Sequence, residues 1–120
     1  MFEKIKRMID THRYKMAVKK ANNIFVESGE RQYILLQTDG ELVVLNRPLF
    51  RKMKEEGRIP ADTTIATLER ECLYHTPYRN GSGEISKAKI KRKLEHYLRW
   101  KEADRQHKAR LKKYCKSINK

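Results

Sequence analysis

Cysteine and histidine side chains are the first candidates for chemistry in this sequence, because they bind metal ions and act as nucleophiles or bases. Cys72 and His75 stand three positions apart, a spacing found among metal ligands, and Cys115 with His96 or His107 would complete a set of four. A structural zinc site normally pairs its ligands at short spacing, and the other candidates are not paired in this way. We therefore interpret Cys72 as a core residue and His75 as a surface residue, and we expect neither a metal site nor a cofactor.

Acid–base catalysis would need carboxylates or histidines brought together on one face. Glu69 and Glu71 lie near His75 in the sequence, but residues two positions apart face different sides of a helix. Asp104 and His107 lie about one helical turn apart, and we interpret them as a polar layer or an exposed pair rather than as an acid and its base. The sequence therefore predicts a protein that is not an enzyme.

Net charge is the strongest signal in the composition. The chain of 120 residues has 29 Lys and Arg against 15 Asp and Glu, which gives a formal charge of +14. Residues 1–22 carry +5 and residues 84–120 carry +10, whereas residues 23–83 carry −1. A small domain stays soluble with a net charge of about 2 to 8, and a larger excess repels itself in the compact state. The two basic ends therefore predict an anionic partner, and nucleic acid is the commonest one for a basic protein inside the cell.

Few cysteines and short apolar runs restrict the setting of the protein. Two cysteines, Cys72 and Cys115, are too few for a disulfide framework, and the residues that follow the start, Phe2 to Arg7, are mostly charged. The longest apolar runs are residues 33–36 and 42–45, far from the roughly 20 residues of a membrane span. We expect one domain without a transmembrane segment, in the cytoplasm or inside a nucleoprotein particle.

Helical periodicity dominates the first part of the chain. Apolar residues that recur three, four and seven positions apart predict a helix over residues 2–22, bent near Thr11-His12. Ile24-Phe25-Val26 then forms a short β-prone run, which Ser28-Gly29 closes.

A β-hairpin is the clearest local prediction. Two β-rich runs, residues 32–38 and 41–45, flank Asp39-Gly40. An Asp-Gly pair is the preferred two-residue hairpin connection, because its positive φ angles match the strand twist. We therefore expect a small antiparallel sheet built on this hairpin.

Short helices are expected after the hairpin. Asn46-Arg47-Pro48 is typical of a helix start and Gly57 of a helix end, which predicts a helix over about residues 48–56. Its predicted inner face consists of Leu49, Phe50 and Met53.

The signal between residues 59 and 77 is mixed. Thr63-Thr64-Ile65 favours a strand, but the apolar spacing that follows favours a helix capped by Asp62 or Thr63, and we prefer the helix. Two such helices would also suit a helix-turn-helix, although the connection is long for that motif, and ordinary packing on the hairpin is the better interpretation. Residues 79–83 predict a loop, whose Gly81-Ser82-Gly83 is only a weak signal for anion binding.

One long helix is expected at the C-terminal end. From Glu84 or Ser86 to Ile118 no Gly or Pro interrupts the chain, so the helix would be roughly 50 Å long. An apolar arc about 100° wide would pack it on the hairpin domain. The arc consists of Ile90, Leu94, Tyr97 and Leu98.

A second set of positions on this helix follows the alternating spacing of a coiled-coil seam, although Lys93 and polar residues interrupt it. We call this set the seam. Such a seam is weak as a free coiled coil, so its members would stack on bases or dock on a protein partner. These members are Tyr97, Trp100, Leu111, Tyr114 and Ile118.

The positive charges of the long helix are the candidate binding residues, because Lys and Arg at this density neutralise phosphates and release counterions. The nucleic-acid-binding candidates are Lys89, Lys91, Arg92, Lys93, Arg99, Lys101, Arg105, Lys108, Arg110, Lys112, Lys113 and Lys116. Supporting charges come from Lys4, Lys6, Arg7, Arg13, Lys15, Lys19 and Lys20. The charges point all round the helix, which does not favour sequence-specific readout.

Together these features predict an α+β fold, with residues 1–83 as a small domain and residues 84–120 as a long basic helix packed on it or projecting from it. The leading function is non-catalytic binding of DNA or RNA, directed mainly at the backbone. The alternative is a structural or adaptor subunit of a large assembly, such as a virion or ribosome-like particle, which would dock through the seam. A solvated helix whose charges only maintain solubility is the third interpretation.

Overall fold

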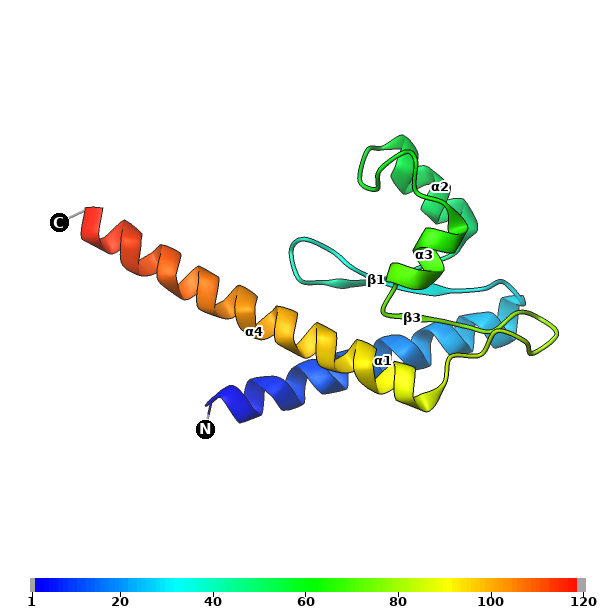
Figure 1. Cartoon of the computed structure of the whole chain (residues 1–120), viewed down its shortest axis with the longest axis horizontal. Coiled ribbons are helices and arrows are strands. Elements are labelled where there is room, and N and C mark those ends of the chain that lie inside the picture. The colour runs from blue at the N-terminus through cyan, green and yellow to red at the C-terminus, as the bar shows by residue number, and fades with distance from the viewer. Residues whose placement is uncertain (1, 119–120) are drawn as a thin grey trace.

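The computed structural model describes residues 2–118, and the side chains of residues 2–116. Its elements are α1 (Phe2–Ser28), β1 (Tyr33–Leu36), β2 (Leu42–Leu45), α2 (Arg47–Glu55), α3 (Ile65–Glu71), β3 (Tyr74–His75) and α4 (Lys87–Ile118). Figure 1 shows α1 and α4 on one side of the sheet, α2 and α3 on the other, and the end of α4 extending past the sheet. The predicted α+β fold is confirmed. Within the described residues, no helix has the length and apolar character that a bilayer crossing requires.

The sheet is antiparallel with strand order β2-β1-β3, and helices cover both of its faces. Successive side chains of a strand point to opposite faces, so β1 and β2, which are apolar at every position, supply both cores. The core shared with α1 and α4 contains Ile34, Leu36, Leu42 and Val44. The core shared with α2 and α3 contains Tyr33, Leu35, Val43 and Leu45. The sheet therefore connects two cores.

The hairpin is confirmed, but its turn is one residue longer than predicted. The N–H of Gln37 donates to the carbonyl oxygen of Glu41 at 2.9 Å, so the loop contains three residues, 38–40. Positive φ angles in the described chain occur only at glycines, and Gly40 has a φ of +89° while Asp39 stays in the ordinary region. A β-turn followed by one left-handed glycine gives this three-residue loop, and it avoids the strain of a left-handed aspartate.

Helix α1 continues further than predicted, to Ser28, and passes without interruption through Thr11-His12. The β-prone interpretation of residues 24–26 is therefore wrong. Intrinsic β propensity is a weak preference, and Ile24 and Phe25 are half-buried as part of the helix. Gly29, with a φ of +72°, ends α1 by donating its N–H to the carbonyl oxygen of Phe25 at 2.8 Å.

The predicted helix after the hairpin is confirmed as α2. The side-chain oxygen of Asn46 accepts the N–H of Leu49 at 3.0 Å, and Gly57 follows the helix with a φ of +76°. Phe50 and Met53 are buried and Leu49 is half-buried, as the spacing indicates. Local capping residues thus determine both ends of α2.

Helix α3 is confirmed, but Thr64 caps it rather than Asp62 or Thr63, and its hydroxyl accepts the N–H of Thr67 at 3.1 Å. The short strand β3 that follows was not predicted, because two residues are too few to show a period. It pairs with β1 and buries His75, which is 7% exposed. The interpretation of His75 as a surface residue was therefore wrong.

Helix α4 begins after Ser86, whose hydroxyl accepts the N–H of Lys89 at 3.2 Å. Its predicted apolar arc packs on α1 and the sheet. The rings of Tyr97 and Tyr14 lie 6.1 Å apart, and the Tyr14 hydroxyl donates to the carbonyl oxygen of Leu73 at 2.8 Å. Burial raises the pKa of Tyr14 well above its ordinary value, so this hydroxyl stays a donor.

Candidate functional site

Two of the predicted phosphate-binding cations hold α4 to the domain instead. Arg105 donates from Nη1 to Oδ2 of Asp10 at 2.7 Å, and the Asp10 side chain is only 3% exposed. Lys93 donates from Nζ to the carbonyl oxygen of Arg70 at 2.7 Å. A buried carboxylate requires its partner, so Arg105 has a structural role that its sequence context did not indicate.

The other predicted cations differ in how much of their charge is available. Lys108 pairs with Asp104 one turn earlier on α4, at 3.0 Å, and Lys89 and Lys101 are half-buried. Seven more are exposed, and none of them forms an ion pair with a carboxylate among the described side chains. These seven are Lys91, Arg92, Arg99, Arg110, Lys112, Lys113 and Lys116. We call them the free cations of α4.

Three of the free cations form a line on α4 opposite its buried arc. Arg92, Arg99 and Arg110 are seven and eleven positions apart, which places them within about 20° of one another around the helix axis. The line extends roughly 27 Å along the axis, at 1.5 Å per residue. It can therefore contact several phosphates of one extended backbone at once.

The aromatic members of the seam are divided between the core and the surface. Tyr97 is 1% exposed, so it acts as a packing residue. Trp100 is half-buried over the hairpin turn, since a Cβ atom on Gly40 would lie 3.3 Å from its Cζ3. Tyr114 is 64% exposed and is the aromatic side chain of the seam that is most open to a partner. The Ile118 side chain lies outside the described residues.

The basic residues of α1 belong to a helix that packs against α4. Arg7 contacts Glu95 through Nη2 and Oε2 at 3.0 Å, in an exposed ion pair. The six other predicted cations of α1 are exposed, and they form no ion pair with the described carboxylates. These are Lys4, Lys6, Arg13, Lys15, Lys19 and Lys20. The two basic ends of the chain thus meet through the Arg7–Glu95 and Asp10–Arg105 pairs, where α1 packs on α4.

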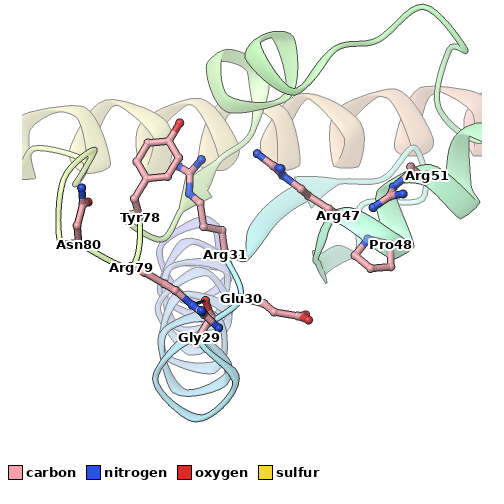
Figure 2. A pocket seen from close by; sticks show the side chains of 9 residues that line it. All are labelled: Gly29, Glu30, Arg31, Arg47, Pro48, Arg51, Tyr78, Arg79 and Asn80. Carbon is pink, nitrogen blue, oxygen red and sulfur yellow. Dashed lines mark hydrogen bonds between the residues drawn. The ribbon is translucent and has the colours of Figure 1, made fainter.

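A second basic site lies in the middle of the chain, where the sequence predicted no net charge. Arg31, Arg47, Arg51 and Arg79 line a hollow of about 650 Å³ between the end of α1, the first turns of α2 and the loop after β3. We call it the arginine hollow. Figure 2 shows Arg47 pointing toward Arg31, with Arg51 beside Pro48 and Arg79 extending toward Gly29.

Arg31 forms the inner wall of the arginine hollow and is held on several sides. It forms an ion pair with Glu69, and its guanidinium carbon lies 3.9 Å from the centre of the Tyr78 ring. It also donates from Nη2 to the carbonyl oxygen of Thr76 at 3.2 Å. Partial burial alone would raise the pKa of Glu69, but the hydrogen bond and charge of Arg31 outweigh burial, so this pKa lies below its ordinary value. The charge of Arg31 is therefore compensated within the protein.

The net charge of residues 23–83 did not indicate the arginine hollow, because it sums over the whole segment. Residues 23–83 contain nine carboxylates against eight cations, but the ion pairs of the described structure engage only Arg31, Arg58 and Arg70 among these cations. Of these carboxylates, Glu30 belongs to the lining, and Glu69 lies behind Arg31. The four-residue spacing of Arg47 and Arg51 on a predicted helix was the one available signal, because it places both on one face.

The cysteines and histidines considered for chemistry lie in two places, with Cys72 and His75 in the core and the others on the surface of α4. Cys72 is buried, as predicted, and burial raises the pKa of its thiol to about 11, so the thiolate is not available. Burial lowers the pKa of His75, and its Nδ1 lies 3.2 Å from Nη2 of Arg31. Cys115, His96 and His107 are exposed on α4. Among the described residues, no group of three or more Cys, His, Asp or Glu side chains is arranged to hold a metal ion.

The carboxylates considered for catalysis are engaged in ion pairs. Glu69 pairs with Arg31, whereas Glu71 is exposed and its Oε1 lies 3.3 Å from Nε of Arg70. Asp104 pairs with Lys108. These carboxylates therefore act in charge compensation.

Comparisons with known proteins found no relative of this chain. No family model matches it, and neither curated proteins nor solved structures give a significant match.

Proposed function

We propose that the protein is a non-catalytic nucleic-acid-binding protein that binds the phosphate backbone of DNA or RNA through the free cations of α4. The observation that carries this proposal is the set of seven exposed cations without a carboxylate partner in the described structure. Holding so many like charges on one helix is unfavourable unless an anion compensates them. A polyanion with regularly spaced charges suits a helix that carries cations along most of its length.

Binding in this proposal depends on how α4 is anchored. Its first part packs into the core through Tyr97 and Leu98, and the Asp10–Arg105 ion pair fixes its direction. The cations that follow lie on the same continuous helix. Because their backbone is already ordered, the protein loses less conformational entropy on binding. Arg and Lys contacts to phosphate set affinity without reading bases, which supports a backbone-directed mode.

Charge reversal on the exposed line of α4 tests the proposal. The triple variant R92E/R99E/R110E should bind labelled oligonucleotides much more weakly, with a salt dependence reduced by about one unit of slope for each lost contact. The matched control is K52E/R58E/R70E, which changes the same net charge on the α2–α3 side. Equal loss in both variants would contradict the proposal, because only the overall charge would then matter.

The cellular location of the protein is inferred from this proposed function and not from its fold. A protein that binds nucleic acid through α4 would act inside the cell or within a nucleoprotein particle. This assignment is tested together with the binding itself.

A structural or adaptor role is the second candidate, and exposed apolar side chains favour it. Leu111 and Tyr114 on α4 are 49% and 64% exposed, and Phe2, Ile5 and Ile9 form an exposed apolar line on α1. Such lines are typical of protein contacts. Under this candidate, L111S/Y114S should prevent assembly with a protein partner and R92E/R99E/R110E should have little effect. A self-associated species that persists at high salt would favour this candidate, because salt weakens charge contacts and not apolar ones.

A further inference from the structure

We propose that the arginine hollow binds a terminal phosphate group, in the form of a phosphomonoester or a diphosphate. The proposal does not depend on the function assigned to α4, because the hollow uses different residues. Guanidinium groups from three separate segments of the chain meet around one concave space of about 650 Å³. A space of this size holds a phosphate together with part of the molecule that carries it.

Three of the four guanidinium groups have no carboxylate partner. Glu69 compensates Arg31, whereas Arg47, Arg51 and Arg79 form no ion pair with any described carboxylate. Glu30 also belongs to the lining, where its Oε2 accepts a hydrogen bond from Nδ2 of Asn46 at 3.0 Å and its charge offsets one of these three positive charges. The hollow therefore has an excess of positive charge, and a bound anion would relieve the repulsion among its guanidinium groups.

Two of the guanidinium groups are positioned before any ligand arrives. Arg31 is fixed by Glu69, Thr76 and the Tyr78 ring. Arg79 donates from Nε to the carbonyl oxygen of Gly29 at 2.9 Å, with its Nη groups left to donate elsewhere. A Cβ atom on residue 29 would lie 2.8 Å from Nη2 of Arg79, so glycine leaves room for the guanidinium group here, and its φ of +72° is one that other residues rarely adopt. Side chains already in place lose less entropy on binding.

The chemistry of the lining selects a terminal phosphate over a phosphodiester. A phosphomonoester carries a charge of about −1.5 to −2 at neutral pH and has three oxygens that accept hydrogen bonds. The guanidinium groups of Arg47, Arg51 and Arg79 match that charge, and each can donate two N–H hydrogen bonds to these oxygens. A phosphodiester carries a single charge and has two free oxygens, so it would leave part of the positive excess uncompensated. ADP and the 5′-phosphorylated end of a nucleic-acid strand both carry such a group and serve as probes.

Calorimetric titration of the full-length protein with pyrophosphate, ADP and adenosine tests the proposal. Pyrophosphate and ADP should each bind at a single site, and adenosine should not bind. The R47A/R51A variant should lose affinity for pyrophosphate by about tenfold or more, since it removes two charge-assisted contacts. R58A is the matched control, because Arg58 is exposed and pairs with Glu56 outside the hollow. The single variant R51E, which changes only an exposed side chain of α2, gives a second measurement if R47A/R51A is poorly folded.

The same variants distinguish the two sources of the phosphate. A preference for 5′-phosphorylated over 5′-hydroxyl oligonucleotides that disappears in R51E would identify the strand end as the ligand. Binding of ADP with no such preference would identify a free nucleotide, and either result supports the hollow as a phosphate site. Failure of pyrophosphate and ADP to bind at millimolar concentration would overturn the proposal. Equal loss of affinity in R47A/R51A and R58A would also overturn it.

Discussion

The two halves of α4 are both rich in Lys and Arg, but their surroundings differ. In the near half, residues 87–105, apolar side chains pack on α1 and the sheet, and Lys93 and Arg105 are bound to the domain. In the far half, residues 106–116, every described side chain is exposed. Figure 1 shows the far half extending away from the sheet. Lys93 and Arg105, which lie beside the packed side chains, therefore have structural roles, whereas the basic residues that face solvent in either half remain available.

This difference shows that a density of Lys and Arg does not by itself define a binding surface. Arg105 and Arg110 lie five positions apart on the same helix, and the first holds a buried carboxylate while the second contacts solvent. The neighbouring apolar arc decides between these roles, because it ends at Leu98 and leaves the later turns without a core to face. Breaking the packed face of the near half should therefore affect stability, whereas charge reversal at the free cations of either half should affect binding.

The largest stability effect is expected at the Asp10–Arg105 pair. R105A leaves the Asp10 carboxylate buried without its partner and should lower the free energy of unfolding by about 3–5 kcal/mol. R110A removes the same side chain from the far half and should change it by at most about 0.5 kcal/mol. Urea denaturation followed by circular dichroism measures both. Equal effects in the two variants would contradict the structural distinction between the halves.

Matched leucines give the next largest contrast. L98A removes a side chain that is 4% exposed and should lower the free energy of unfolding by about 2–5 kcal/mol. L111A removes one that is 49% exposed and should cost about 0.5 kcal/mol or less. The same denaturation experiment decides the result. A large loss in L111A would mean that the far half packs on something in the free protein.

A smaller effect is expected where the near half meets the hairpin turn. G40A imposes a side chain at a φ of +89° and places its Cβ 3.3 Å from Trp100, which should cost about 1–2 kcal/mol. G57A is the control, since its φ is +76° but nothing lies within 4 Å of its Cβ. Trp100 emission should shift in G40A and stay unchanged in G57A. The same shift in both variants would show that Trp100 does not contact the turn.

The smallest expected effect is a dependence of stability on pH. Burial lowers the pKa of His75, with the Thr76 carbonyl acting against it and the charges of Arg31 and Lys89 adding to it. The unfolded state then binds a proton more readily, so stability is complete above the ordinary pKa of about 6.5 and falls as the pH drops below it. H75Q should reduce this slope, whereas H12Q, at an exposed position, should not. Thermal unfolding followed between pH 5 and pH 8 measures the slope in each variant, and an unchanged slope in H75Q would contradict this role of His75.

Elements with local signals could be predicted from the sequence. Asn46 and Gly57 mark the ends of α2, and the apolar runs around Asp39-Gly40 specify the hairpin. The long uninterrupted α4 follows from the absence of Gly and Pro. These features depend on neighbouring residues, which the sequence contains directly.

Features that depend on distant residues could not be predicted. Strand β3 exists because Tyr74 and His75 pair with β1, which lies some forty positions earlier in the chain. The arginine hollow brings Arg31 and Arg79 together across a similar separation. The role of Arg105 depends on Asp10, at the other end of the chain. In each case the partner is determined by the tertiary fold.

The most direct test of the account is a fluorescence anisotropy titration of labelled single-stranded and duplex oligonucleotides with the full-length protein at several salt concentrations. If α4 binds a nucleic-acid backbone, the oligonucleotides should bind at low salt. The logarithm of the affinity should then fall linearly with the logarithm of the salt concentration, as expected for several phosphate contacts. R92E/R99E/R110E should reduce that slope. Absence of binding at low salt, or an affinity that does not change with salt, would contradict the proposal that α4 binds a nucleic-acid backbone.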